Sequence, residues 1–313
     1  MTAEEDFEIF YEKHMLPVME EVRYRAEQPA PWMVVGLVSA MLIVLIWFVG
    51  SVNELNNYEV LVVILLFVIV VSFFKYYKQK ELYEDQYKTS VIQAIINYIS
   101  PGIVYNPRHC LGQDVYDKSS LYRRYYDRFT GGDLIEGTIA GVHFRCSELF
   151  TYYSSTGRSR GDTSIFGGLF FVIDINNRFT GGTYIWPKGD EQLPVSIYSD
   201  YYRMMPMPAI TGIIFNDAEF DHYFSAYTTY LTQATEILTQ EFRNELVLLR
   251  KSLQVNFSIS FVAGECFMAI PFSTDLLQPP ANMNEIKEDI RYDFEMVQKI
   301  VNTVRCLSFS KLL

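Results

Sequence analysis

The amino-acid sequence predicts an α+β protein, in which an N-terminal hairpin of two transmembrane helices is followed by a cytoplasmic domain of mostly antiparallel strands with packed helices. Three observations lead to this prediction: two uncharged apolar runs lie near the N-terminus, short alternating or β-branched segments begin at Asp133, and amphipathic helical stripes occupy the C-terminal third. Four regions follow, which are an amphipathic helix over 1–31, the hairpin over 32–77, a juxtamembrane helix and irregular connector over 78–126, and an α+β domain over 127–313. A proline- and methionine-rich link at 204–209 is a candidate division of that last domain into two sub-units.

The first 31 residues predict an acidic amphipathic helix. Its apolar positions recur at helical spacing and are Phe7, Tyr11, Met15, Val18 and Val22. Pro17 should kink this helix, because it has no N–H to donate to the carbonyl of Lys13. Eight carboxylates stand against three cations in this segment, and a solvated acidic face explains them without a special partner.

The two apolar runs predict membrane spans at 32–50 and 58–77. Met33 to Val49 contains no charge and only one hydroxyl, Ser39, while Val60 to Phe74 has Ser72 as its only polar residue. At about 1.5 Å per residue, the first span covers about 28 Å, which matches a hydrocarbon core of about 30 Å. Channels need polar groups at membrane depth, so anchoring is favoured over a pore lined by Ser39 or Ser72 in an oligomer.

The cations that flank the spans predict the orientation. The loop from Ser51 to Glu59 has no Lys or Arg, whereas cations precede the first span and follow the second, at Arg23, Arg25, Lys75, Lys78, Lys80 and Lys88. Because cytoplasmic loops carry the excess of Lys and Arg, both termini should lie on the cytoplasmic side of a bacterial inner membrane. The net charge of −11 argues against a nucleic-acid partner, and the scatter of Lys and Arg along the sequence argues against a lipid-binding stripe.

The cytoplasmic part predicts a sequence of elements. A continuous helix should run from Val60 to about Ile99, and the segment Ile103 to Tyr126 should be irregular. Strands are predicted at Asp133–Ala140, Val142–Tyr153, Ile165–Ile175, Thr183–Trp186, Ile210–Phe215 and Phe224–Tyr230, with a hairpin of Val255–Val262 and Glu265–Pro271. Three helices are predicted: a short one capped by Asn216 or Asp217, one from Ala234 to Leu253, and a last one from Met283 to Val304 that should dock on the sheet.

One pentapeptide, RFTGG, occurs at Arg128–Gly132 and again at Arg178–Gly182. Reused turn chemistry is favoured over a duplicated fold unit, because nothing else in the flanking sequence repeats. These glycine turns and the polar tip around Arg158 to Asp162 are the candidate interaction surface. Its residues are Arg128, Gly131, Gly132, Arg158, Arg160, Asp162, Arg178, Gly181 and Gly182.

Catalytic signatures do not rise above background in this sequence. Glu136 and Glu148 on adjoining strands would offer paired carboxylates for acid–base chemistry, and His109 beside Cys110 would offer a nucleophile pair, but solvated strand residues and unrelated neighbours are the favoured readings. His143 is expected to be a packed or surface histidine. The four cysteines have no CxxC spacing and predict free thiols, and no metal or other cofactor is expected.

Longer stretches carry a resemblance that no short motif does. They are FYEKHMLPVMEEVRYR before the first span, DRFTGGDLIEGTIAGVHFRCSEL at Asp127–Leu149, FGGLFFVIDINNRFTGGTYIWP at Phe166–Pro187 and DAEFDHYFSAYTTYLTQATEILT at Asp217–Thr239. With these, the chain resembles the bacterial membrane-associated family called domain of unknown function 3137. The resemblance implies a two-span protein with a cytoplasmic α+β domain, no catalytic residues, and an association with LemA-type membrane proteins.

The sequence as a whole favours a membrane-anchored scaffold or sensor that recognises a protein partner and performs no catalysis. Its partners would be the lipid bilayer, a protein such as a LemA-type membrane protein, and further copies of itself if it forms a homo-oligomer. A ligand-binding effector, in which a nucleotide or lipid headgroup rearranges the hairpin, is the first alternative. A hydrolase that uses Glu136 and Glu148 is the weaker one.

Overall fold

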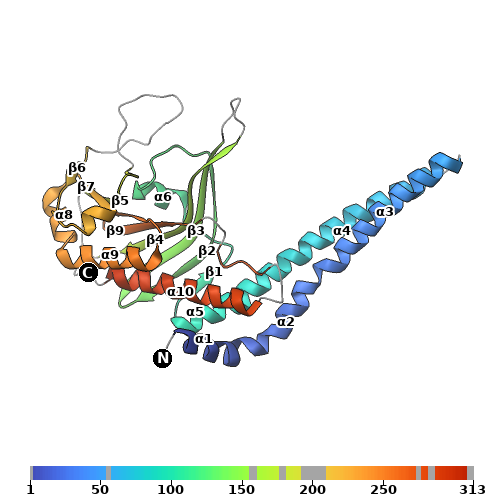
Figure 1. Ribbon diagram of the computed structural model, residues 1–313, viewed down its shortest axis with the longest axis horizontal. Coiled ribbons are helices and arrows are strands. Elements are labelled where there is room, and N and C mark those ends of the chain that lie inside the picture. The colour runs from blue at the N-terminus through green and yellow to red at the C-terminus, as the bar shows by residue number, and fades with distance from the viewer. Residues whose placement is uncertain are drawn as a thin grey trace. The chain divides into compact units, whose positions relative to one another are not determined.

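The computed structural model describes residues 3–53, 58–154, 161–175, 181–191, 209–272, 276–280 and 286–308. The chain divides into two compact units (Figure 1). The helical unit consists of Met1–Ile95 and Leu277–Phe294, and the sheet unit consists of Ile96–Leu276 and Glu295–Leu313. The predicted α+β class is confirmed, because a pair of long apolar helices is followed by a nine-stranded antiparallel sheet with helices.

The helical unit begins with an almost continuous helix. Its elements are α1 (Ala3–Phe10), the π-helix η1 (Tyr11–Met15), α2 (Leu16–Glu27), α3 (Pro29–Asn53), α4 (Tyr58–Tyr87), the π-helix η2 (Lys88–Ile92) and the start of α5 (Gln93–Ile99). Only Gln28 interrupts α2 and α3, because Pro29 begins α3 where its missing N–H costs nothing. The predicted continuous helix from Val60 to Ile99 is confirmed, with the π-turn of η2 inside it.

The apolar face of α1 and α2 differs in part from the predicted one. The buried residues are Phe7, Phe10, Met15, Met19 and Val22. The step of five residues from Phe10 to Met15 matches the wider turn of η1, in which the Leu16 N–H donates to the Tyr11 carbonyl. This π-turn ends two residues before Pro17, which has no N–H to donate to the carbonyl of Lys13.

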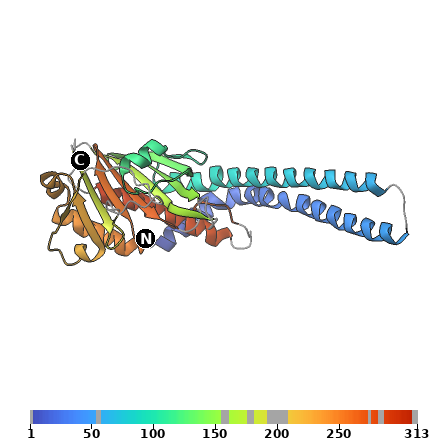
Figure 2. The same cartoon turned by 90° about the horizontal axis from the view of Figure 1, so that it is seen from above.

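Helices α3 and α4 form an antiparallel hairpin and run side by side (Figure 2). Both belong to helices that are long and apolar enough to cross a membrane, Glu4–Val49 and Glu59–Ile99. Large apolar side chains point outward from them, with Met41 74% exposed and Phe67 68% exposed. The two hydroxyls, Ser39 and Ser72, are instead buried within the hairpin, where the Ser39 hydroxyl donates to the Val35 carbonyl at 2.8 Å.

The sheet unit is built on nine strands in the order β1-β2-β3-β4-β9-β8-β5-β7-β6. The strands are β1 (Val104–Asn106), β2 (Arg128–Ile139), β3 (Val142–Ser154), β4 (Asp162–Asp174), β5 (Gly182–Pro187), β6 (Thr211–Ile213), β7 (Phe224–Thr228), β8 (Ser258–Val262) and β9 (Glu265–Pro271). All neighbours are antiparallel. The predicted hairpin turn is confirmed, because Ala263 and Gly264 have φ of 51° and 81°, as a two-residue type I′ turn requires.

Helical segments cover both faces of this sheet (Figure 1). The Phe242 ring of α9 (Gln240–Leu253) lies 5.9 Å from the Phe261 ring, on one face. On the other face, the segment that contains α6 (Gln113–Ser119) is held by two hydrogen bonds: the Trp186 indole N–H donates to the Leu121 carbonyl at 3.2 Å, and the Ser260 hydroxyl to the Ser119 carbonyl at 2.7 Å. Because both faces are covered, most strand side chains are buried.

Three predicted elements differ from the structure. Residues 103–126 contain β1 and α6 rather than an irregular connector. The helix predicted from Ala234 to Leu253 is split into α8 (Leu231–Ile237) and α9, because the Thr239 hydroxyl accepts the Phe242 N–H and caps a new helix. The last helix, α10 (Ile286–Ser308), docks on the sheet unit only with residues 295–308, while residues 286–294 belong to the helical unit.

Candidate functional site

Two of the predicted interaction residues, Arg128 and Asp162, meet at the ends of β2 and β4, beside the end of β3. Arg128 of β2 forms an ion pair with Asp162 of β4, and both side chains are about half exposed. The guanidinium of Arg128 also lies 5.3 Å from the ring centroid of Tyr152 on β3. We call Arg128, Tyr152 and Asp162 the strand-end cluster. Arg158, Arg160 and Arg178 lie outside the described residues.

The first glycine pair, Gly131 and Gly132, permits a close approach of chains at the start of β2. A Cβ atom on Gly131 would lie 2.7 Å from Leu149 Cδ2 and would also meet the Glu148 carbonyl oxygen. A Cβ atom on Gly132 would lie 3.2 Å from the Pro107 carbonyl oxygen. Directly after this pair, the Asp133 N–H donates to that same oxygen at 3.0 Å, so the glycines let the 107–110 segment cross over β2.

The second glycine pair has a similar structural role. The Gly182 N–H donates to the Thr229 hydroxyl at 2.8 Å, and the Thr229 N–H donates to the Gly182 carbonyl at 2.9 Å. A Cβ atom on Gly181 would lie 3.2 Å from Tyr230 Cβ. The two pairs are not brought together. Four strands separate β2 from β5, which corresponds to about 24 Å at about 4.8 Å per strand.

Replacing Gly131 with alanine is expected to lower the free energy of unfolding by about 1–2 kcal/mol, because backbone and packed side-chain atoms surround the position. Thermal unfolding of the detergent-solubilised protein measures the change. Gly161→Ala is the matched control, since no atom lies within 4 Å of its Cβ position. Equal melting temperatures for the two variants would contradict the close-approach role.

The carboxylate pair proposed for hydrolysis is ruled out by strand register. Glu136 pairs with Arg145, which is three residues from Glu148 on β3. An odd offset places the two side chains on opposite faces of the sheet. Glu148 is buried, and its Oε1 accepts the Leu276 N–H at 2.8 Å. Glu148 therefore anchors the chain that leaves β9, and it does not share a site with Glu136.

Cys110, the possible nucleophile beside His109 that the sequence did not favour, lacks an activating environment. Burial raises the pKa of the Cys110 thiol, which is the opposite of what a reactive thiolate needs. All four cysteines are free thiols, as predicted. His143 is exposed, and its Nδ1 lies 3.0 Å from Asp174 Oδ2. Within the described ranges, no group of three or more His, Cys, Asp or Glu side chains could hold a metal ion.

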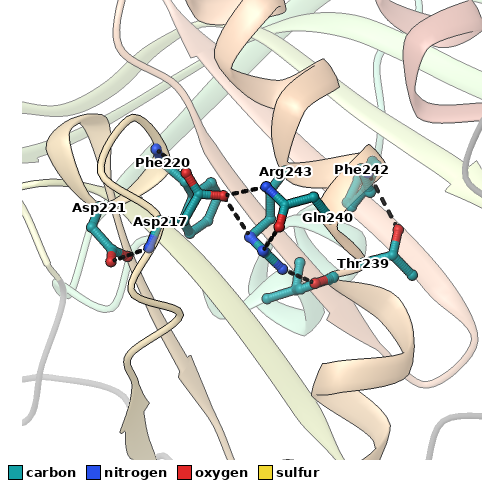
Figure 3. A network of polar contacts seen from close by, with 8 residues as sticks. Asp217, Phe220, Asp221, Thr239, Gln240, Phe242 and Arg243 are labelled. Atoms are coloured by element: carbon teal, nitrogen blue, oxygen red, sulfur yellow. Dashed lines mark hydrogen bonds and ion pairs between the residues drawn. The ribbon is translucent and has the colours of Figure 1, made fainter.

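A buried polar network that sequence reasoning missed lies at the start of α9 (Figure 3). The Arg243 Nε donates to Asp217 Oδ2 at 3.1 Å, its Nη1 donates to the Leu238 carbonyl at 2.7 Å, and its Nη2 donates to Gln240 Oε1 at 3.0 Å. Asp217 Oδ1 accepts the Phe220 N–H at 3.2 Å, at the first residue of the short helix α7 (Phe220–Tyr223), whose N-cap position is Glu219 rather than the predicted Asn216 or Asp217. The sequence offers one signal for this network, which is the position of Asp217 three residues before Phe220. Its cationic partner, Arg243, lies 26 residues after Asp217 and has no local signal.

The electrostatics of this network favour a structural role. The Phe220 N–H, followed by the Arg243 guanidinium, lowers the pKa of Asp217. Arg243 is also stacked 4.4 Å from the ring centroid of Phe215. A carboxylate held ionised by a buried arginine is a poor general base, because its proton affinity is reduced. The network therefore fastens the loop before α7 to α9.

A second polar cluster lies in the helical unit, between α1, α4 and residues 286–294 of α10. The Tyr87 hydroxyl donates to Asp293 Oδ2 at 2.6 Å, and both side chains are buried. On the outer side, Glu8 accepts from Lys287 at 2.7 Å and from Arg291 at 3.2 Å. Phe294 packs beneath these pairs, 5.6 Å from the Phe7 ring centroid. The acidic face expected to be merely solvated is therefore partly paired.

Comparison with known proteins agrees with the resemblance seen in the sequence. Residues 164–307 match the family model described as protein of unknown function (DUF3137). The chain is similar to that family over this segment. The DUF3137 segment runs from β4 into α10 and includes the Asp217–Arg243 network. The family description assigns no activity.

Two further comparisons contribute no functional assignment. No curated protein matches the sequence. Among solved structures, the chain is similar to the crystal structure of the mycobacterial trehalose monomycolate transport factor A, TtfA, with 11% sequence identity, coverage of 69% of this chain and 93% of that chain, and a TM-score of 0.34. A TM-score this low carries no argument about function.

Proposed function

We propose that this protein is a membrane-anchored scaffold, which holds the sheet unit at the cytoplasmic face of a bacterial inner membrane and binds a protein partner there without catalysis. The observation that carries the proposal is the outward apolar surface of α3 and α4. Trp47 is 67% exposed, and Met41 and Phe67 are more exposed still. In water an apolar surface of this extent would promote aggregation, whereas in a bilayer the lipid tails contact the same side chains and shield them from water.

Two features support placing both termini on one side. The loop between the spans has no Lys or Arg, while cations flank the other ends of both spans. In addition, α1 precedes the first span and α10 follows the second, yet Phe10 and Phe294 pack with their ring centroids 5.1 Å apart. Segments in van der Waals contact lie on the same side of a membrane, which requires an even number of crossings.

The scaffold role is supported by a contrast in the sheet unit between polar groups that are hydrogen-bonded in the interior and a polar cluster that is exposed. The buried Asp217–Arg243 pair is closed by hydrogen bonds, and Glu148 is occupied by the Leu276 N–H. The strand-end cluster is instead half exposed and combines a cation, an aromatic ring and a carboxylate. Arginine and tyrosine are enriched in protein interfaces, so this cluster is the preferred partner contact.

Co-purification of the full-length protein with a co-expressed LemA-type membrane protein tests this proposal. We expect a complex with the wild-type chain, and on the order of tenfold less partner with Arg128→Ala, because a central interface arginine contributes more than about 1 kcal/mol. Lys251→Ala removes an exposed ion pair with Glu219 elsewhere in the sheet unit and serves as the control. Reproducible absence of the partner together with turnover of a metabolite by the protein would refute the scaffold role, and light scattering of the same samples reports any homo-oligomer.

A second candidate is a ligand-binding effector, which is favoured by the unbroken helix from Glu59 to Ile99. A helix that leaves the membrane without a hinge transmits a displacement of its cytoplasmic end. Thermal-shift measurements with nucleotides and soluble headgroups distinguish this candidate. Uniformly flat responses would exclude it and leave the scaffold role.

A further inference from the structure

The cations of the helical unit fall into two groups. Three of those farther from the spans are paired: Lys88 Nζ lies 3.7 Å from Glu84, and Lys287 and Arg291 both contact Glu8. Lys13 lies far from the spans and is exposed. Those nearest the spans make no ion pair with any carboxylate of the described chain, and they are Arg23, Arg25, Lys75, Lys78 and Lys80. We call these five residues the cationic belt. An exposed and unpaired group of one sign attracts a ligand of the other sign.

The hairpin brings the five cations of the belt to a similar height along the helix axes. The scatter of Lys and Arg along the sequence did not predict this grouping. Lys75 Nζ lies 5.8 Å from the ring centroid of Trp32, so these two positions mark a common height. Arg25 lies about 10 Å along the helix before Trp32, and Lys80 lies about 8 Å beyond Lys75. Helices α2 and α4 also contact each other directly. Two cations from α2 and three from α4 thus gather beside the apolar surface.

The surroundings of the belt match the headgroup region of a bilayer. Over residues 23–32 and 75–80, Glu27 is the only carboxylate, and Glu20, Glu21 and Glu81 lie farther out. Tyr24, Phe74 and Tyr77 are exposed in the same turns, and aromatic side chains prefer the interface. Long Lys and Arg side chains extend toward the phosphates from positions at and just beyond the hydrocarbon edge.

We propose that the cationic belt binds the phosphates of anionic phospholipid headgroups. This inference rests on the proposed membrane anchoring. The chemistry is charge complementarity: five cations against one carboxylate, at the depth where lipid phosphates lie, and with no protein counter-ion in the part of the chain that the structure describes. Anionic lipids would therefore be enriched around the base of the hairpin.

Lipid retention by the full-length protein tests the proposal. The protein is reconstituted in vesicles of one part phosphatidylglycerol to three parts phosphatidylcholine, extracted in mild detergent, and the retained lipid is quantified by mass spectrometry. We expect the ratio of phosphatidylglycerol to phosphatidylcholine to exceed that of the vesicles on the order of fivefold. Lys75→Gln, Lys78→Gln and Lys80→Gln combined should return the ratio toward that of the vesicles.

A matched control removes three other cations. Lys13→Gln, Lys299→Gln and Arg305→Gln combined change the net charge equally, but these exposed residues lie outside the belt. The control should keep the enrichment. No enrichment with the wild-type chain, or enrichment that survives the Lys75, Lys78 and Lys80 changes, would overturn the proposal. Flotation with the vesicles distinguishes failure of the membrane anchoring from failure of the lipid preference. A chain that does not float refutes the anchoring, whereas a floating chain without enrichment refutes only the lipid preference.

Discussion

Replacing Arg243 with alanine is expected to lower the free energy of unfolding of the sheet unit by about 3 kcal/mol. The side chains of Arg243 and Asp217 are only 9% and 11% exposed, and removing one partner leaves the other charge buried without compensation. For a unit of this size, such a loss corresponds to a fall in melting temperature of about 6–12 °C. Thermal unfolding followed by near-ultraviolet circular dichroism of the detergent-solubilised protein measures it.

An exposed ion pair provides the control for this prediction. Lys251 and Glu219 are 2.9 Å apart on the surface, so Lys251→Ala should leave the melting temperature unchanged within error. The pKa of Asp217 is lowered by the Phe220 N–H and then by Arg243. Its contribution to stability is therefore complete above about pH 4 and is lost as the pH falls further. An Arg243→Ala protein that melts like the wild type would show that the network contributes no stability.

Replacing Tyr87 with phenylalanine is expected to destabilise the helical unit by about 1.5–3 kcal/mol. The change removes the hydrogen bond to the buried Asp293 carboxylate, and hydrogen bonds to charged groups contribute about that amount. Because the bond joins α4 to α10, amide hydrogen exchange should accelerate in residues 286–294. Tyr24→Phe is the control, since Tyr24 is 61% exposed. Unchanged exchange in both variants would contradict this account of the contact.

The same phenols predict an alkaline limit to stability. Burial, followed by the nearby Asp293, raises the pKa of Tyr87 above its usual value. Burial and then Asp289 raise the pKa of Tyr83 to about 12. The folded state therefore favours the protonated phenols, and their stabilisation is complete below about pH 10 and declines as the pH rises from there. Tyr87→Phe should flatten that decline, which a pH series of the hydrogen-exchange measurement resolves.

Local patterns predicted most elements of the fold. Apolar runs without charge predicted α3 and α4, and Ala263-Gly264 predicted the turn between β8 and β9, where Gly264 adopts a positive φ without steric cost. The elements that the sequence did not predict depend on contacts that no local pattern reveals. The three residues of β1 are a strand because β2 pairs with them, and no local pattern reveals this pairing. Similarly, α8 and α9 share one apolar stripe, so the capping by Thr239 was hidden within it.

The polar contacts were harder to predict than the elements. The acidic start of the chain predicts a solvated helix. In the structure Glu8 instead pairs with Lys287 and Arg291, which lie about 280 positions later in the sequence. The sequence predicts Asn216 or Asp217 as a helix cap, but the pairing of Asp217 with Arg243 depends on how the loop before α7 meets α9. The sequence predicts the glycines of RFTGG as part of an interaction surface, and what the structure shows at Gly131 and Gly132 is a close approach of neighbouring backbone.

Thiol labelling of intact spheroplasts tests the anchored hairpin most directly. Single cysteines are placed at Asn56 in the loop between the spans, at Lys13 in η1, and at Lys299 in α10, in a chain whose four native cysteines are replaced by serine or alanine. A membrane-impermeant maleimide is added before or after lysis. The account predicts that Asn56→Cys reacts in intact spheroplasts, whereas Lys13→Cys and Lys299→Cys react only after lysis. Labelling of position 13 or 299 from outside the intact cell would contradict it.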